Sequence, residues 1–192
     1  GIGREPFSSA LANANLVWGL AAVPLGAVSD RYGTGRVVLL GVVCTMLGLY
    51  SMYMATTPAM LELSGLLLGI GIGGTGVTAL VGAVGRVATT EQRPAALASL
   101  GMAAGIGGFI AFPYASYFIQ ALGWKQSLLV LVATAALLLP LAAPLRGRST
   151  ATGPLRQQTL KEAFDEAFRL PSFWLFAAGF FVCGFHVAFY ST

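Results

Sequence analysis

Residues 6–61 read PFSSALANANLVWGLAAVPLGAVS-DRYGTGR-VVLLGVVCTMLGLYSMYMATTPAML, and they decide the fold. Two stretches without Asp, Glu, Lys or Arg, residues 6–29 and 37–61, flank a short segment, residues 30–36, that holds one acid and two arginines. A helix needs about 20 apolar residues to cross the ~30 Å hydrocarbon layer of a membrane. Both stretches reach that length, so the region predicts two membrane helices joined by a tight polar turn.

The same pattern continues along the whole chain. Uncharged stretches cover residues 6–29, 37–61, 63–85, 94–124, 126–145 and 170–192. Charged residues make up 9% of the chain, against roughly 25% in soluble domains. The stretches lack the polar face of a soluble helix and the alternation of a barrel strand. The sequence therefore predicts an all-α, polytopic transmembrane helical bundle with six membrane helices.

The distribution of basic residues predicts the orientation of these helices. When the segments between stretches are assigned to alternate sides, one side holds only Arg4 and Lys125. The other side holds the remaining nine: Arg31, Arg36, Arg86, Arg93, Arg146, Arg148, Arg156, Lys161 and Arg169. Basic residues accumulate on the cytoplasmic side of membrane proteins. The net charge of +4 thus reports topology rather than nucleic-acid binding, and the lipid bilayer is the expected partner.

The chain has one long connector, which suggests a domain boundary. We expect an N-terminal transmembrane bundle in residues 1–145, a cytoplasmic connector in residues 146–170, and the first helix of another bundle in residues 171–192. The connector begins with a flexible Ser/Thr/Gly-rich part. Its second part has apolar residues at i, i+4 and i+8 among charged ones, which is typical of an amphipathic helix at a membrane surface: Leu160, Phe164 and Phe168. We read the chain, which starts at Gly1, as a fragment.

The segment Gly26-Ala27-Val28-Ser29-Asp30-Arg31-Tyr32-Gly33-Thr34-Gly35-Arg36 is the sharpest local signal. Asp30 stands where a helix ends, and the partial negative charge of a helix C-terminus disfavours a carboxylate. Asp30 therefore needs compensation from nearby cations, and Arg31, Arg36 and Arg86 are expected on the same side. For Arg86, simple anchoring of the third stretch at the surface is the alternative role.

This segment resembles the loop signature of the major facilitator superfamily, G-x-x-x-D-[RK]-x-G-[RK]-[RK]. Gly26, Asp30, Arg31 and Gly33 match the signature. Thr34 and Gly35 depart from it, because basic residues are usual there, and Arg36 supplies a cation one place later. The resemblance implies a loop between the second and third family helices that locks two bundles together on the cytoplasmic face.

The resemblance also implies an architecture and a function. The six stretches would be family helices two to seven of about twelve, so the first helix and most of the second bundle are expected outside this chain. Residues 172–192 resemble the seventh helix of bacterial monocarboxylate-transporter-like members. The expected function is a secondary active transporter that moves a small solute by alternating access. The favoured solute is a small organic anion such as a monocarboxylate, and the expected location is the bacterial cytoplasmic (inner) membrane.

Two polar residues within the stretches are candidates for a substrate or proton path. His186 is the only histidine, and its ordinary pKa lies near physiological pH, so it could carry a coupling proton. The alternative is a neutral histidine that bonds to a neighbouring helix. Asn13 could face a cavity, whereas Asn15 shares a face with small residues and is expected to bond between helices.

Rows of small residues predict the helix-packing faces. Close helix approach in lipid uses small residues spaced four apart: Gly19, Gly65, Gly69, Gly73, Gly101 and Gly105. Two interpretations stay open for these rows. They could form tight static packing, or smooth interfaces along which bundles rock.

Other function classes find little support in the sequence. Gly69–Gly74 fits the G-x-G-x-x-G dinucleotide pattern, but it lies inside an apolar stretch and lacks the downstream acid. We therefore predict no cofactor, no metal site and no enzyme activity. The alternatives to uptake of an organic anion are a proton-coupled drug or metabolite exporter, and, outside transport, a fragment of a membrane-embedded enzyme or a scaffold.

Overall fold

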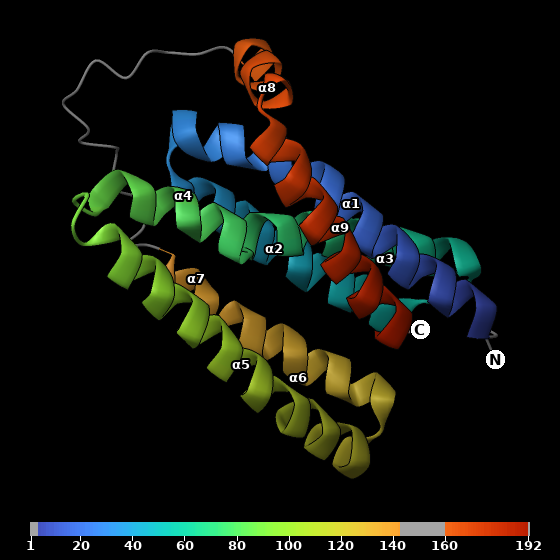
Figure 1. Ribbon diagram of the computed structural model, residues 1–192. Helices are drawn as coiled ribbons and strands as arrows, with labels where there is room; N and C mark the ends of the chain where they lie inside the picture. Colours follow the sequence, from blue (N-terminus) through green and yellow to red (C-terminus); the bar gives the residue numbers. More distant parts are fainter. Residues whose placement is uncertain (1–3, 143–159, 192) are drawn as a thin grey trace. The chain divides into compact units, whose positions relative to one another are not determined.

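The computed structural model describes residues 4–142 and 160–191, and these ranges form helices with no strand among them (Figure 1). Within these ranges some side chains lie outside the described part, including those of Asp30, Arg86 and His186. The chain divides into two compact units, Gly1–Ala151 and Thr152–Thr192. The all-α prediction is confirmed for the residues that the structure describes.

The first unit contains seven described helices, which follow one another in short steps. They are α1 (Arg4–Tyr32), α2 (Thr34–Met54), α3 (Pro58–Thr75), α4 (Val77–Val87), α5 (Arg93–Leu122), α6 (Trp124–Ala136) and α7 (Leu138–Leu141). The second unit contains α8 (Leu160–Arg169) and α9 (Pro171–Ser191). Each helix therefore falls within or beside a stretch that the charge pattern marks.

Local sequence signals explain where these helices begin and end. The side chain of Thr57 accepts a hydrogen bond from the Met60 N–H at 3.4 Å, and Pro58 follows at the first helical position of α3. Gly33 and Gly123 have positive φ values of 94° and 83°, a conformation that favours glycine. These two glycines separate α1 from α2 and α5 from α6.

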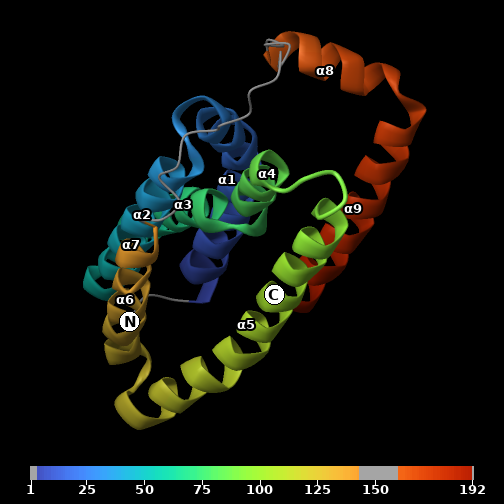
Figure 2. The same ribbon diagram turned by 90° about the vertical axis from the view of Figure 1, so that its left-hand side faces the viewer.

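The helix α3 is the centre of packing in the first unit, because it contacts α1 and α2 extensively. α2 also packs against α6, and α5 contacts α4 and α6. In Figure 2, α5 and α6 form a hairpin: they meet at the turn after Leu122 and diverge away from it. A small apolar core joins α2 to the end of this hairpin: Val38, Val42, Met46, Leu139 and Ala142.

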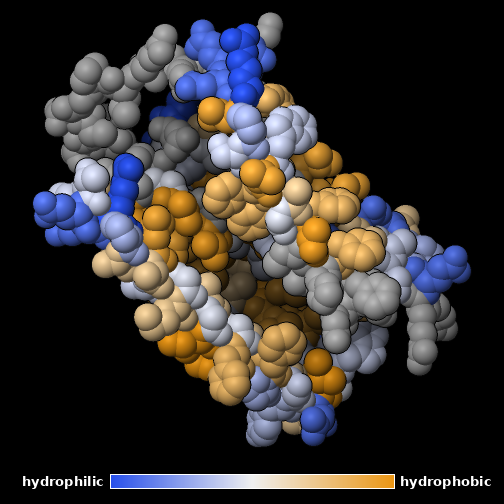
Figure 3. Space-filling view, in the orientation of Figure 1, coloured by the Kyte–Doolittle hydropathy of each residue, from blue (hydrophilic) through white to orange (hydrophobic). Residues whose placement is uncertain are grey.

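Most large apolar side chains lie on the surface rather than inside. Phe109 and Phe112 of α5 are 80% and 79% exposed. In Figure 3, hydrophobic residues cover much of the visible face of α5, and hydrophilic residues gather at the α4–α5 loop. Soluble proteins rarely expose apolar surface on this scale. Such a surface suits hydrocarbon, so the exposure pattern agrees with a membrane protein.

Five helical segments are long and apolar enough to cross a membrane. They are Glu5–Ser29, Thr34–Met54, Pro58–Val84, Arg93–Leu122 and Trp124–Leu141. The predicted sixth stretch forms α9, whose described apolar part, Pro171–Val182, is shorter. Lys125 lies over the Tyr53 ring at 5.4 Å, near the end of α2. The α1–α2 turn lies at the other end of this 21-residue helix, so Lys125 and that turn are at opposite ends of the bundle.

The structure differs from the charge pattern in three details. The turn after α1 is a single residue, Gly33, because α1 continues to Tyr32. Glu62, which separates two uncharged stretches, lies inside α3. The stretch 63–85 is not one helix, since the chain leaves helical geometry at Gly76 (ψ 169°) and resumes it in α4. Backbone hydrogen bonding rather than charge decides these boundaries.

Candidate functional site

The α1–α2 turn brings the motif residues together in a compact arrangement. The Gly33 N–H donates to the Ser29 carbonyl oxygen at 3.0 Å, which closes the last turn of α1. With φ at 94°, Gly33 reverses the chain within one residue, and any side chain there would strain the backbone. The motif glycine is therefore required by the geometry of the turn.

The loop signature usually has basic residues at positions 34 and 35, and the packing of Thr34 explains why this chain does not. Thr34 is 4% exposed and Ser29 is 2% exposed, and their hydroxyl oxygens lie 3.0 Å apart. Gly35 is buried as well, whereas Arg36 is exposed. A basic residue at position 34 or 35 would place its charge among packed helices, which is costly. The first solvent-facing position of α2 is 36, and it carries the arginine.

The described cations of this turn point to solvent rather than to the bundle interior. Arg31 is exposed and its guanidinium carbon lies 5.6 Å from the centre of the Tyr32 ring, within cation–π range. Arg36 is exposed on the first turn of α2. The side chains of Asp30 and Arg86 lie outside the described residues, so their pairing stays a prediction. An added Cβ atom at Gly26 would meet none of the described residues within 4 Å.

A second polar cluster lies at the opposite end of α1 and joins it to α3. The side-chain amide of Asn13 and the hydroxyl of Ser9 each donate to a different oxygen of the Glu62 carboxylate. The Ser9 hydroxyl also lies 3.1 Å from the Pro6 carbonyl oxygen. The Glu62 carboxylate, one turn inside α3, thus has two donors from a neighbouring helix.

Sequence reasoning missed this cluster because it treated Glu62 as a boundary between stretches. The signal was nevertheless present. Thr57 and Pro58 mark the start of a helix, which places Glu62 one turn inside it. Ser9 and Asn13 are four residues apart, so they lie on one face of α1. A predicted cavity role for Asn13 stays a prediction, and the structure adds that its amide contacts Glu62.

The predicted packing residues fall into two groups. Added Cβ atoms at Gly65 and Gly69 would collide with Ala10 and Ala14 of α1, and one at Gly73 would lie 3.3 Å from Leu25. Added Cβ atoms at Gly19, Gly101 and Gly105 would meet nothing within 4 Å among the described residues. Asn15 donates to the Leu11 carbonyl of its own helix at 3.0 Å. The interhelical role of this second group stays a prediction.

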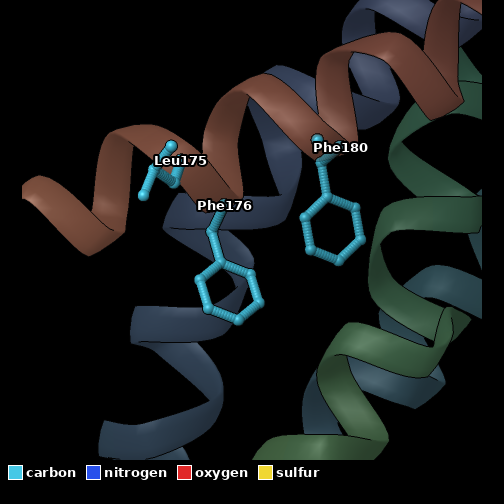
Figure 4. A pocket seen from close by; sticks show the side chains of 4 residues that line it. Leu175, Phe176 and Phe180 are labelled. Carbon is cyan, nitrogen blue, oxygen red and sulfur yellow. The ribbon is translucent and has the colours of Figure 1, made fainter.

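The second unit contributes an apolar surface on α9. Leu175, Phe176, Gly179 and Phe180 line a shallow pocket, and the two phenylalanine rings extend to the same side of the helix (Figure 4). The Trp174 indole N–H donates to the Phe168 carbonyl at 3.1 Å, which ties the start of α9 to α8. The pocket lining is apolar, so it offers no group that would orient a polar ligand. His186 lies further along α9, and its side chain is outside the described part.

No group of three or more His, Cys, Asp or Glu residues that could hold a metal occurs within the described residues. The candidate site therefore consists of two polar regions at opposite ends of an apolar bundle. One is the glycine-closed, arginine-bearing α1–α2 turn. The other is the Ser9–Asn13–Glu62 cluster. Polar groups at the ends of closely packed apolar spans are typical of a polytopic membrane protein.

Comparison with known families agrees with this class. The sequence profile of the Major Facilitator Superfamily matches residues 5–192, and the chain belongs to that family. Membership of this family identifies the chain as a membrane transporter. Searches of curated proteins and of solved structures gave no match.

Proposed function

We propose that the chain belongs to a secondary active transporter that moves a small organic anion, such as a monocarboxylate, across the bacterial cytoplasmic membrane. The observation that carries the transport mechanism is the α1–α2 turn, in which Gly33 reverses the chain in one residue between two apolar spans. A turn this short fixes the ends of α1 and α2 together. Such a pair can move as one body when two bundles rock about a central site.

The charged residues of the α1–α2 turn can hold the α1–α2 pair against an opposing bundle. Arg31 and Arg36 stand exposed on either side of Gly33, where they can reach an acidic group of an opposing bundle. Asp30 ends the same helix, and we propose that Asp30 and Arg86 complete the lock. Asp30→Asn should then shift the balance between inward-facing and outward-facing states, measured by cysteine accessibility in the full-length protein. An unchanged balance removes Asp30 from the mechanism.

The preference for an organic anion rests on the resemblance of residues 172–192 to the seventh helix of monocarboxylate-transporter-like members. The described residues of α9 add an aromatic and apolar face, which suits the hydrocarbon part of a short-chain carboxylate. The cation that would bind the carboxylate is expected outside this chain. Coupling to protons, with His186 as a carrier, is part of the same proposal.

Uptake of labelled L-lactate by proteoliposomes tests this function. Vesicles containing the full-length protein are given an inward proton gradient, and vesicles with a proton ionophore serve as the control. We expect accumulation above the equilibrium level that the ionophore abolishes. Lactate exchange without gradient-driven accumulation would contradict proton coupling. Absence of both, with gradient-driven movement of a cationic drug, would favour the exporter instead.

A further inference from the structure

The helix α2 exposes one narrow face along its length. The exposed residues of this helix stand three or four positions apart, which places them on the same side, while the other residues are buried or half-buried. The exposed positions are Arg36, Leu40, Val43, Leu47, Tyr50 and Met54. After the arginine this face is apolar. We call its last four residues, Val43, Leu47, Tyr50 and Met54, the α2 stripe.

The α2 stripe has the length of one leaflet of a bilayer. The 21 residues of α2 rise about 31 Å at 1.5 Å per residue, close to the ~30 Å thickness of the hydrocarbon layer. From Val43 to Met54 the rise is about 16 Å, which is half of that thickness. This half lies away from the α1–α2 turn, on the side that the charge pattern predicts to be outside. An acyl chain of the outer leaflet would therefore lie beside the stripe.

A cation lies at the end of the α2 stripe, and aromatic rings connect the two. The Lys125 ammonium group of α6 lies 5.4 Å from the centre of the Tyr53 ring, within cation–π range. The Tyr53 ring stacks in turn on Tyr50 of the stripe, with 6.2 Å between ring centres. Trp124, next to the lysine, is 59% exposed. The packing of α2 against α6 thus places a positive charge directly above an apolar face.

The Lys125 ammonium group can bind a further anion. Its side chain is exposed, and an ammonium group has three N–H donors, whereas a ring occupies only one side of it. The first turn of α6 contains no acid. The acids expected on this side, Glu5 and Glu62, belong to α1 and α3, while α6 packs on α2 and α5. Glu62 already accepts from Ser9 and Asn13.

We propose that an anionic phospholipid of the outer leaflet binds at this place, with its phosphate on Lys125 and an acyl chain along the α2 stripe. Tyrosine and tryptophan side chains favour the headgroup level of a membrane, which is where Tyr50 and Trp124 would hold the glycerol region. A basic residue at the membrane surface attracts anionic headgroups, and a water-soluble anion would not use the apolar stripe. The proposal is independent of the solute that the protein transports.

A fluorophore in the α2 stripe tests this proposal at the site itself. Leu47→Cys, at a position that is 52% exposed, carries a bimane label in full-length protein whose other cysteines are replaced by serine. The protein is placed in phosphatidylcholine vesicles that contain a small fraction of phosphatidylglycerol with a nitroxide on its acyl chain. Nitroxide-labelled phosphatidylcholine with the same chains is the reference lipid. Quenching reports how strongly each lipid is enriched beside the stripe.

The headgroup preference should depend on the position of one charge. Phosphatidylglycerol should be enriched about fivefold over phosphatidylcholine, which is the effect of one lysine near a membrane surface. Lys125→Gln should abolish this preference, and Lys125→Arg should keep it. The matched control is the double variant Lys125→Gln/Gln126→Lys, which has the same composition but moves the charge around the helix, away from Tyr53. We expect it to behave like Lys125→Gln.

Three results would overturn the proposal. The first is equal quenching by the two lipids in the protein that retains Lys125. The second is a full preference in the double variant, since a general surface charge would then suffice. The third is displacement of the labelled lipid by an equal concentration of glycerol 3-phosphate, which would show that the site binds a free phosphate. If Lys125→Gln does not fold, high salt replaces it: a preference that salt does not reduce would also exclude Lys125.

Discussion

Two glycine rows in this protein have the same sequence pattern and opposite surroundings. In the α3 row, added Cβ atoms at Gly65 and Gly69 would collide with Ala10 and Ala14 of α1, and one at Gly73 would lie 3.3 Å from the Leu25 side chain. In α5, Gly101, Gly105, Gly107 and Gly108 are all exposed, and an added methyl group would meet nothing within 4 Å among the described residues. Small residues spaced along a membrane helix therefore predict a smooth face, but not which neighbour covers it.

The difference separates the two roles that such rows can have. We propose that the α3 row is static packing, because added Cβ atoms at Gly65 and Gly69 would collide with backbone atoms of α1. On the α5 row, an added Cβ atom would meet none of the described residues within 4 Å. We propose that this row meets the other bundle of the transporter, where small residues permit close contact and movement.

Filling the α3 row should produce the largest effect on stability. Gly69→Val would force three methyl-sized groups against the Ala14 carbonyl and the Val17 side chain, and overpacking of this kind costs about 1–3 kcal/mol. Gly107→Val adds the same atoms to the exposed row as a control. The apparent free energy of unfolding in an SDS titration measures both. An equal decrease in the free energy of unfolding of Gly69→Val and Gly107→Val would show that the two rows are packed alike.

Removing the polar link beside the α3 row should have a smaller effect. Glu62→Leu leaves the Ser9 hydroxyl and the Asn13 amide without their partner across α1 and α3. Interhelical hydrogen bonds in membranes average about 0.6 kcal/mol each, so the loss should be about 1 kcal/mol. The same SDS titration measures it, with Glu62→Gln as the isosteric control that keeps part of the bonding. A stability gain in Glu62→Leu would show that the cluster does not join the helices.

A methyl group added to the α5 row should have the smallest effect on stability. Its effect on transport should show whether the row contacts a moving bundle. Gly105→Ala replaces glycine by the better helix former, so the free energy of unfolding should stay within about 0.5 kcal/mol of the wild-type value. Lactate exchange should nevertheless fall if the other bundle slides along this face. Unchanged exchange would make the row a passive lipid-facing surface.

The sequence predicts the fold well because hydrocarbon imposes simple rules. Three uncharged stretches, 6–29, 94–124 and 126–145, match candidate membrane spans to within four residues, since charges are costly inside the bilayer. The stretches 37–61 and 63–85 misplace the turn between α2 and α3, because Glu62 lies inside α3. The α1–α2 turn is predicted for a similar reason, because Gly33 and the flanking arginines are strong local signals.

Features set by backbone geometry or by distant partners could not be predicted in this way. The break at Gly76 has no charge or proline to announce it, and its φ lies in an ordinary region. The donors to Glu62 are 49 and 53 residues away in the sequence. The buried environment of Thr34 depends on how α1 and α2 pack, which explains why the motif's usual cation occurs at Arg36 instead.

The most direct test of the central claim is the sidedness of two engineered cysteines in intact bacterial cells. Arg31 and Lys125 are both exposed, and they lie at opposite ends of the bundle. In full-length protein lacking Cys44 and Cys183, a membrane-impermeant maleimide should label Lys125→Cys from outside the cell. It should label Arg31→Cys only after the membrane is permeabilised. Labelling of both residues from the same side would contradict the proposed membrane topology, and with it the transport mechanism.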